Sequence, residues 1–437
     1  MEWYNAFIFM VGMILVLMII RIPVAFAFLI ANVVGVIVFM GGHFGIVQLT
    51  ANATDALTNY SLVPIPLFLL MGELFFQTGI ATRVFSVIDR LMGGLRGRLS
   101  YVTIAGGTIF SALSGSSLGN VAMMGSTLYP EMERNNYSRF LSLGPIVATG
   151  GLAAIIPPSG LAVVLGSIAG IDVGRLLLAG VVPGVGLALA YAALVFFWTV
   201  IRPEAAPLYE VAHTPLREKV ILAVTNLLPM GIVVFMVVGL IILGIATPTE
   251  SAAFGVVSVL ILAAFFRCLT IGAIVRAAAG AMRISGMILL IILASSTFSQ
   301  ILSISGATRG LIAQIQSMEV GVYLLLFYMG LVLAVLGAFL DPVGIMMLTI
   351  PVFLPLAASY GIDPIWMGIF ILIFIEFGLA TPPFGLALYV MMGAARNRNI
   401  IDISVSVAPF LLITLIMVVI ITIYPEIVLY LPSLIVN

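Results

Sequence analysis

Charged side chains are scarce in this chain of 437 residues, because Asp, Glu, Lys and Arg together make up only 8% of it. Soluble domains carry about 25% charged residues. The hydrophobic fraction is 63% and the mean hydropathy is +1.30, which is more apolar surface than a soluble fold can bury. The composition therefore excludes a soluble protein and predicts an all-α polytopic membrane protein surrounded by a lipid bilayer.

Cysteine and histidine are almost missing as well. The single Cys268 excludes an internal disulfide framework and any metal site built from several cysteines. The two histidines, His43 and His213, lack the paired spacing of a zinc-binding helix, which argues against a metalloprotease. Basic and acidic residues number 17 each, so no net charge favours nucleic acid as a partner. We expect no enzymatic activity, because the sequence offers no paired nucleophile and base.

Prolines, in contrast, are frequent and recur at a constant offset. The pair Pro157-Pro158 returns as Pro382-Pro383, an offset of 225 residues (382 − 157). Other landmarks return in the same order within two residues of this offset: Pro23 and Pro248, Thr82-Arg83 and Thr308-Arg309, Met123-Met124 and Met346-Met347, Pro130 and Pro355, Pro183 and Pro409. We therefore predict two repeats, residues 1–200 and 220–437, joined by a cytoplasmic linker at 201–219.

Each half divides into the same kinds of segment. The first contains apolar helices at 4–20, 24–41, 62–79 and 176–200, an amphipathic basic stretch at 80–99, an interrupted segment at 100–130 and a broken helix at 141–170. The second contains helices at 220–245, 249–266, 286–303 and 404–424, an interrupted segment at 321–356 and a broken helix at 365–394. As a helix, residues 100–130 would reach about 46 Å, whereas a membrane core is about 30 Å thick. The interruptions, "SGSS" in one half and "LDP" in the other, therefore predict two re-entrant hairpins.

Five crossings and one hairpin per half have a topological consequence. Five is an odd number, so the second half must insert upside down, as an inverted repeat. If the turn at Arg21 is cytoplasmic, this topology puts 15 of the 17 Lys and Arg residues inside and only Arg175 and Arg309 outside. The charge distribution thus predicts that both termini are periplasmic.

The double prolines predict gaps in the backbone hydrogen bonding of the two broken helices. A proline has no N–H, so Pro157 and Pro158 would free the carbonyls of Ala153 and Ala154. Pro382 and Pro383 would do the same for Gly378 and Leu379. Free carbonyls can bind a cation, and the N-terminus of the half-helix after each break can attract an anion.

The hairpin tips supply matching polar groups. The first tip, "SGSSLGN", holds Ser114, Ser116, Ser117 and Asn120, whose oxygens suit a hard cation, although small polar residues also pack helices together. The second tip, "GAFLDPVG", holds Asp341, a carboxylate expected near the bilayer midplane. Asp341 could pair with sodium or could serve only as a helix cap.

Two more acids lie inside apolar helices. Glu73 falls in the third predicted helix, and Glu376 lies six residues before Pro382. Each could carry a proton or make a hydrogen bond between helices, and the sequence leaves this choice open.

Four of these segments resemble a known family. "SALSGSS", "IIPPSG", "ATPTESAAFG" and "ATPPFGLAL" are similar to the large membrane subunit, of the DctM type, of tripartite ATP-independent periplasmic (TRAP) transporters in the ion transporter superfamily. The resemblance covers essentially the whole chain. It implies sodium-driven import of a small organic anion across the bacterial inner membrane by an elevator mechanism. It also implies two partners, a periplasmic substrate-binding protein and a small four-helix membrane subunit, expected here as a separate chain.

The resemblance also implies roles for residues at the tips and breaks. A first sodium site would use Ser114, Ser116, Ser117, Ala154 and Ile156, and a second would use Gly337, Asp341, Ala380 and Thr381. The substrate would contact Ser117, Asn120, Ser159 and Pro383. Sodium is the only metal expected and no organic cofactor is implied. The main alternative is a stand-alone sodium/dicarboxylate-type symporter of the same superfamily, which needs no binding protein.

Overall fold

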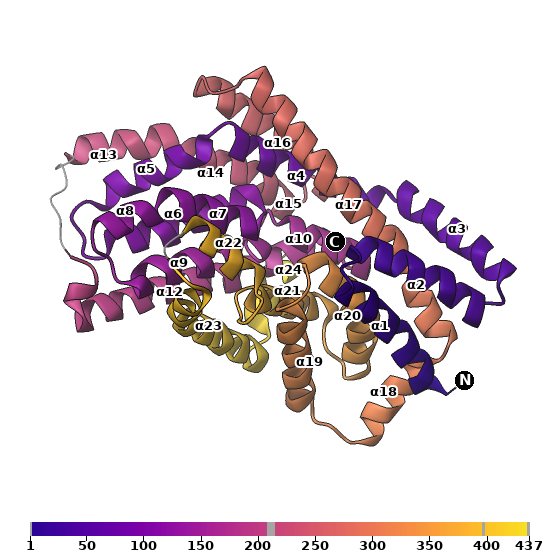
Figure 1. The fold of residues 1–437 in the computed structure, drawn as a ribbon. Helices are drawn as coiled ribbons and strands as arrows, with labels where there is room; N and C mark the ends of the chain where they lie inside the picture. The colour runs from indigo at the N-terminus through magenta and orange to yellow at the C-terminus, as the bar shows by residue number, and fades with distance from the viewer. Residues whose placement is uncertain (1, 208–214, 396–397, 435–437) are drawn as a thin grey trace.

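The computed structural model describes residues 2–207, 215–395 and 398–434, and these residues form helices and turns without any β-strand (Figure 1). Up to residue 207 the helices are α1 (Trp3–Ile19), α2 (Val24–Phe39), α3 (His43–Thr58), α4 (Pro64–Gln77), α5 (Ile80–Met92), α6 (Arg98–Ser114), α7 (Ser117–Thr127), α8 (Tyr129–Arg134), α9 (Arg139–Gly150), α10 (Gly160–Ala169), α11 (Val173–Ala179) and α12 (Val181–Ile201). Short 3₁₀ turns occur at Tyr60–Leu62, Gly151–Ala154 and Pro203–Ala205.

From residue 215 onward the same kinds of element follow. They are α13 (Leu216–Leu222), α14 (Leu228–Val234), α15 (Leu240–Ile242), α16 (Pro248–Phe265), α17 (Ile271–Ile304), α18 (Ala307–Ser317), α19 (Val322–Gly337), α20 (Pro342–Ser359), α21 (Pro364–Leu379), α22 (Leu386–Ala394), α23 (Ile400–Ile423) and α24 (Glu426–Ser433). Two π-helical turns, Ala223–Leu227 and Phe235–Gly239, join α13, α14 and α15 into one rod. The predicted linker at 201–219 lies partly outside the described residues, because 208–214 are not among them.

Six helices among the described residues are long and apolar enough to cross a membrane, or up to seven if α4 and the bent α5 count as one span. The six are Val173–Ile201, Leu216–Ile242, Pro248–Phe265, Ile271–Ile304, Pro342–Ser359 and Ile400–Ile423. The other apolar helices are shorter, at 10–17 residues, partly because each broken helix counts as two pieces. The chain is thus a multi-pass membrane protein, while the ten predicted crossings and the inversion of the second half stay predictions.

Capping residues explain where several of these helices begin. Thr247 caps α16 and forms a capping box with Glu250, and Pro248 occupies the first turn. Asp363 caps α21 through the N–H groups of Ile365 and Trp366. Asn399 caps α23 by accepting a hydrogen bond from the N–H of Asp402. These caps provide partners for N–H groups in the first turn of each helix, which have no partner within the helix itself.

The helix predicted at 286–303 was placed wrongly at its start. It extends back to Ile271 as the 34-residue α17, which packs against α2, α3 and α4 (Figure 1). The sequence analysis assigned no element to residues 271–285, which include Arg276 and Arg283, and both of these side chains are exposed. The opposite face is a row of alanines with high helix propensity, Ala273, Ala277 and Ala281, which are buried.

Three other features were not anticipated. The chain forms α3 and α18, two helices of mixed polarity in segments to which the sequence analysis assigned no element. The helix predicted at 176–200 begins earlier and is interrupted at Gly180 between α11 and α12. A Cβ at Gly180 would lie 1.9 Å from the Ile155 carbonyl oxygen, so this interruption lets the broken helix approach closely.

Each of the four interrupted segments consists of two helices separated by a short break, while the re-entrant course of the two hairpins stays a prediction. The first hairpin is α6 and α7, which meet at Gly115 and Ser116, and the second is α19 and α20, which meet at residues 338–341. The broken helices are α9 with α10 and α21 with α22. The peptide bonds between Pro157 and Pro158 and between Pro382 and Pro383 are both cis.

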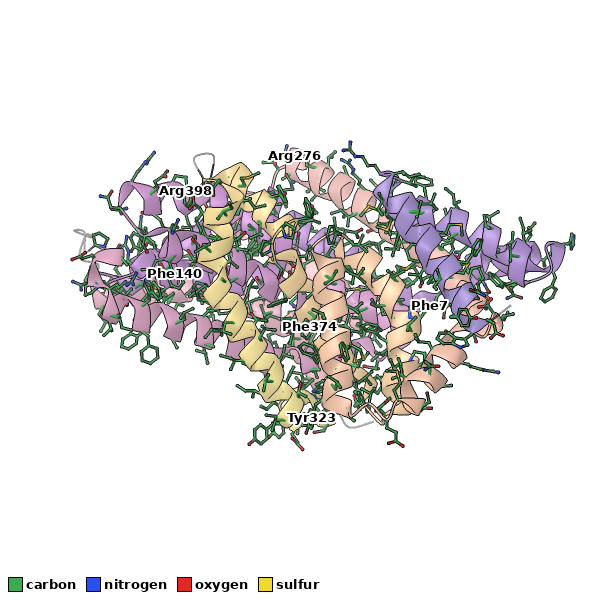
Figure 2. All side chains as sticks on the ribbon, turned by 60° about the horizontal axis from the view of Figure 1, so that its bottom comes forward. Phe7, Phe140, Arg276, Tyr323, Phe374 and Arg398 are labelled. Carbon is green, nitrogen blue, oxygen red and sulfur yellow. The ribbon has the colours of Figure 1, made fainter. Side chains whose placement is uncertain are left out.

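Polar residues mark two opposite edges of the molecule. Figure 2 shows Arg276 and Arg398 along one edge and Tyr323, in the first turn of α19, at the other, with Phe374 between them. The arms of the second hairpin therefore start from the edge opposite to these arginines.

Candidate functional site

A cavity of about 320 Å³ lies where the two hairpin tips approach each other. Its walls come from α4, the first tip, the start of α10, α17 and the start of α20. The residues that line it are Leu69, Gly72, Glu73, Phe76, Phe110, Ser114, Gly115, Ser116, Ser117, Leu118, Gly119, Gly160, Leu161, Val164, Ile284, Met287, Ile288, Asp341, Pro342 and Val343. Glu73 and Asp341 are its charged groups, and no Lys or Arg is among the lining residues.

The first tip is a tight turn held by its own side chains. Gly115 has a positive φ of 59°, a conformation that favours glycine. The Ser116 hydroxyl caps α7 by accepting a hydrogen bond from the Gly119 N–H at 3.2 Å. A Cβ at Gly115 would lie 3.0 Å from the Gly160 nitrogen, so the tip rests against the first residue of α10. Serine hydroxyls and the N-terminal ends of α7 and α10 therefore reach the same cavity.

The second tip places a carboxylate at the start of a helix. Asp341 caps α20, because its Oδ2 accepts hydrogen bonds from the N–H groups of Val343 at 3.1 Å and Gly344 at 3.2 Å. Gly337, just before this tip, lies against Gly378. A Cβ added to Gly337 would lie 2.6 Å from the Cα of Gly378, and one added to Gly378 would lie 2.7 Å from the Cα of Gly337. Each hairpin thus contacts the broken helix of its own half.

The first break is buried and has its own hydrogen bonds. Ser159 is 0% exposed, and its hydroxyl donates to the Ala154 carbonyl at 2.8 Å and accepts from the Ala162 N–H at 3.1 Å. The carbonyl that Pro158 frees is therefore paired, although a carbonyl oxygen has a second lone pair that can bind an ion. Ile156, another predicted ligand, is also buried.

The second break is more open. The Thr381 hydroxyl donates to the Phe377 carbonyl at 2.6 Å, and Ala380 is buried beside it. Pro382, Pro383 and Phe384 are exposed on the surface of the chain. The predicted substrate contact Pro383 is not among the residues that line the cavity between the tips.

Asn120 points away from this cavity. It is 0% exposed, and its amide donates to the Ser111 hydroxyl at 2.6 Å and to the Gly107 carbonyl at 3.2 Å. These partners belong to α6, so Asn120 ties the two arms of the first hairpin together.

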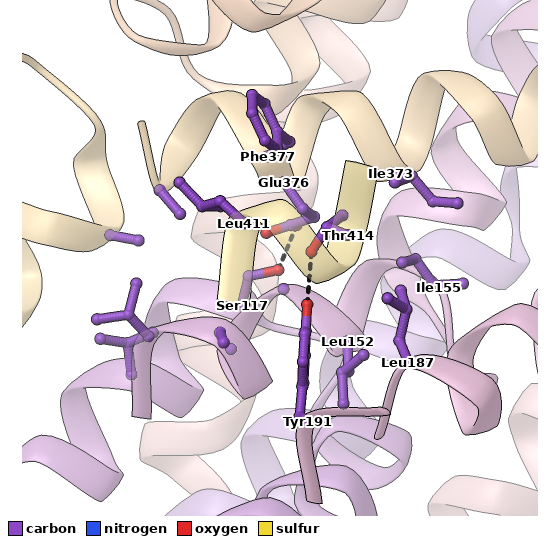
Figure 3. Close-up of a pocket in the computed structure, with 17 residues that line it drawn as sticks. Ser117, Leu152, Ile155, Leu187, Tyr191, Ile373, Glu376, Phe377, Leu411 and Thr414 are labelled. Carbon is purple, nitrogen blue, oxygen red and sulfur yellow. Dashed lines mark hydrogen bonds between the residues drawn. The ribbon is translucent and has the colours of Figure 1, made fainter. Parts of the chain in front are cut away.

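Behind the first tip lies a smaller chamber that sequence reasoning did not foresee (Figure 3). The Ser117 hydroxyl donates a hydrogen bond to Glu376 Oε1. Beside this pair, the hydroxyls of Tyr191 and Thr414 are hydrogen-bonded to each other at 2.7 Å. Glu376 stood out as an acid in an apolar helix, but Tyr191 and Thr414 gave no signal. A lone threonine in such a helix commonly bonds its own backbone, as Thr414 also does with the Phe410 carbonyl.

The cavity combines groups for both signs of charge. Hydroxyls and the Asp341 carboxylate suit a small hard cation. The N-terminal ends of α7, α10 and α20 reach the same space, and such ends favour an anion. The site can therefore hold a small cation and an anion side by side, an arrangement that fits transport better than catalysis.

Comparisons with known proteins identify the family of this chain. Residues 11–427 match the family described as "Tripartite ATP-independent periplasmic transporter, DctM component". The chain is 31% identical to the C4-dicarboxylate TRAP transporter large permease protein DctM of Pseudomonas aeruginosa, over 86% of this chain and 87% of that protein. It is 28% identical to the ectoine TRAP transporter large permease protein TeaC of Halomonas elongata, over 97% and 98%.

A solved structure shares the fold. The crystal structure of the Alcanivorax borkumensis YdaH transporter superposes with a TM-score of 0.62 at 14% identity, covering 90% of this chain and 89% of that one. The family match spans nearly the whole sequence and agrees with the resemblance seen in its motifs. The chain therefore belongs to the DctM family, the large membrane component of tripartite ATP-independent periplasmic transporters.

Proposed function

We propose that this chain imports a small organic anion and that an inward sodium gradient drives the import. The observation that carries the proposal is the cavity between the tips, where Asp341 and the serines of the first tip face the N-terminal ends of α7, α10 and α20. A sodium ion beside Asp341 would offset the cost of burying that carboxylate and would attract the substrate anion. Binding of ion and substrate would then favour each other.

Two sodium sites are proposed, one where each tip contacts the break of its own half. The first would use the hydroxyls of the first tip and the carbonyls of the first break, from Ser114, Ser116, Ser117, Ala154 and Ile156. Its support is the close approach of Gly115 to Gly160. The second would use Gly337, Asp341, Ala380 and Thr381, supported by the contact of Gly337 with Gly378.

The substrate anion would bind mainly through the free N–H groups at the starts of α7 and α10 and would contact Ser117 beside them, whose hydroxyl proton is donated to Glu376. Asn120 and Ser159 are fully buried, so they would act on the substrate through the backbone that they hold in place. Pro383 would contact it only after the second break moves toward the cavity. Relatives named for C4-dicarboxylates and for ectoine indicate the size of solute to test first.

The movement would be that of an elevator. Two inverted repeats, each with its hairpin and broken helix, would carry the cavity across the inner membrane against the remaining helices. With Arg276 and Arg398 at the cytoplasmic edge and Tyr323 at the opposite one, both termini would be periplasmic (Figure 2).

Two partners complete the system. A periplasmic substrate-binding protein would deliver the anion, and a small four-helix membrane subunit on a separate chain would cover part of the apolar surface. Membership of the family supports both partners. It also makes a stand-alone symporter the weaker alternative.

Reconstitution with single omissions tests this assembly. Proteoliposomes that contain the chain, the small subunit and a sodium gradient should take up radiolabelled anion only when the binding protein is present. Leaving out the small subunit should abolish uptake as well. Full uptake by the chain alone would favour the stand-alone symporter and refute the tripartite assembly.

A further inference from the structure

The chamber behind the first hairpin tip is separate from the cavity between the tips. It has a volume of about 20 Å³ and is lined mostly by apolar residues of α9, α12, α21 and α23. Four polar side chains from four different helices reach it, Ser117, Tyr191, Glu376 and Thr414 (Figure 3). Ser117 also borders the larger cavity, so it lies in the wall that the two spaces share.

Glu376 is the only charged residue among those that line the chamber. Its side chain comes from α21 and the residue is 7% exposed. One carboxylate oxygen accepts the hydrogen bond from Ser117, and none of the ion pairs found among the described residues includes Glu376. A carboxylate without a positive partner in apolar surroundings is costly, so Glu376 must either be protonated or bind a cation.

The other polar groups complete a set of oxygen ligands. A hydroxyl carries one donor and two lone pairs, so Ser117 can donate to Glu376 and still offer its oxygen to an ion. The Tyr191 and Thr414 hydroxyls, 2.7 Å apart, bring two more oxygens from α12 and α23. Hydroxyl and carboxylate oxygens are the ligands of hard cations.

Size and composition narrow the choice of cation. A space of this volume holds about one water-sized particle, because one water needs roughly 10–15 Å³ measured in this way. The described residues contain no group of three or more His, Cys, Asp and Glu side chains that could hold a metal ion, which disfavours a transition metal or calcium. One carboxylate with neutral hydroxyls balances a single positive charge.

We propose that the chamber binds a sodium ion, held by Glu376, Ser117, Tyr191 and Thr414, in addition to the two ions at the hairpin tips. This inference rests on the proposed sodium-coupled transport and extends it. Glu376 belongs to the second half of the chain and Ser117 to the tip of the first, so the ion ties the first tip to the opposite half. The first tip is then fixed in its substrate-binding geometry only when the chamber is filled.

Equilibrium binding of ²²Na⁺ to the purified complex of the full chain and its small subunit tests the proposal. Glu376→Gln keeps the shape of the side chain and removes its charge. We expect this variant to bind one sodium ion fewer per chain at saturation than the unmodified protein. Glu250→Gln is the matched control, because Glu250 lies at the exposed start of α16, and it should bind the full number.

Two further variants keep the test decisive if Glu376→Gln folds poorly. Tyr191→Phe and Thr414→Val each remove one neutral ligand and little volume, and each should raise the sodium concentration for half-saturation roughly fivefold. Thermal unfolding without sodium checks that every variant is folded.

The possible failures are distinct. If all folded variants bind the same number of ions with the same half-saturation as the unmodified protein, the chamber is not a sodium site. If the unmodified protein binds no sodium at all, the proposed sodium coupling itself is wrong.

Discussion

The two double-proline breaks share a sequence plan but have opposite surroundings. The first is buried between the hairpin tip and Gly180, and Ser159 satisfies the Ala154 carbonyl. The second has Pro382, Pro383 and Phe384 exposed, and Phe384 is 50% exposed. An enclosed break is held by its packing, whereas an open break is free to respond to a ligand. Changes at the first should therefore affect stability, and changes at the second should affect ion and substrate binding.

The two hairpin tips also differ, in this case in their charge. The second tip carries the Asp341 carboxylate, whereas the polar side chains of the first are uncharged, namely serine hydroxyls and the Asn120 amide. The nearest carboxylate to the first tip comes from the other half, through the bond between Ser117 and Glu376. The breaks thus occupy equivalent positions in the two halves, but the second half supplies the carboxylate at both tips.

The largest effect is expected from removing the charge of the second tip. Asp341→Asn keeps a good helix cap but removes the charge that would bind sodium. Loss of a charged ligand should raise the half-saturating sodium concentration for uptake roughly 10- to 100-fold, while assembly is retained. A sodium titration of uptake in proteoliposomes measures this shift.

The same capping position in the first tip supplies the comparison. Ser116→Ala removes a neutral group, so its half-saturating sodium concentration should change roughly fivefold. If the Asp341→Asn curve coincides with that of the unmodified protein, Asp341 is a structural cap and the charge comparison of the tips fails.

A smaller effect, on stability, is expected at the packed break. The Cβ of Gly180→Ala would lie 1.9 Å from the Ile155 carbonyl oxygen, in a region where the backbone cannot move freely. Such overpacking costs about 1–3 kcal/mol, so the apparent melting temperature in detergent should fall.

Two glycines serve as controls for that measurement. Gly286→Ala meets nothing within 4 Å inside α17 and should melt at the temperature of the unmodified protein or slightly above it, because alanine favours the helix more than glycine does. Gly385 is buried, and the Cβ of Gly385→Ala would lie 2.5 Å from the Leu379 carbonyl oxygen and 2.7 Å from that of Thr381, but the exposed residues just before it, Pro382, Pro383 and Phe384, can relax. If Gly385→Ala is less stable than Gly180→Ala, the contrast between a packed and an open break is wrong.

The smallest effect concerns single hydroxyls at the breaks. Ser159→Ala removes a helix cap and the partner of the Ala154 carbonyl, which should cost about 0.5–2 kcal/mol of stability. Thr381→Val should cost less, because its hydroxyl bonds only the Phe377 carbonyl within its own helical turn. Thermal unfolding of both variants under one condition compares their losses of stability. An equal loss would contradict the contrast between the packed first break and the open second break.

Much of the fold could be predicted from the sequence because the interruptions of its apolar runs mark where helices break. In a chain of apolar helices, a double proline or a polar glycine-rich stretch marks a break, and Ser116 and Asp341 lie where the tips were expected. The start of α17 was missed because the prediction followed only the apolar run at 286–303, although a helix can continue past the membrane surface with a long basic side chain such as that of Arg276 on it.

The chamber could not be predicted, because it depends on tertiary packing. Tyr191 and Thr414 are more than 200 residues apart, and nothing local marks either as a ligand. Asn120 was expected to face the substrate from its place in the tip, but the direction of its side chain follows from the packing of α6 against α7.

Uptake driven by defined gradients tests the central claim most directly. Proteoliposomes with the chain, the small subunit and the binding protein should accumulate the anion when sodium is high outside, with a sigmoidal dependence on sodium because several ions act together. A proton gradient without sodium should drive none. Equal uptake with a proton gradient alone would contradict the account.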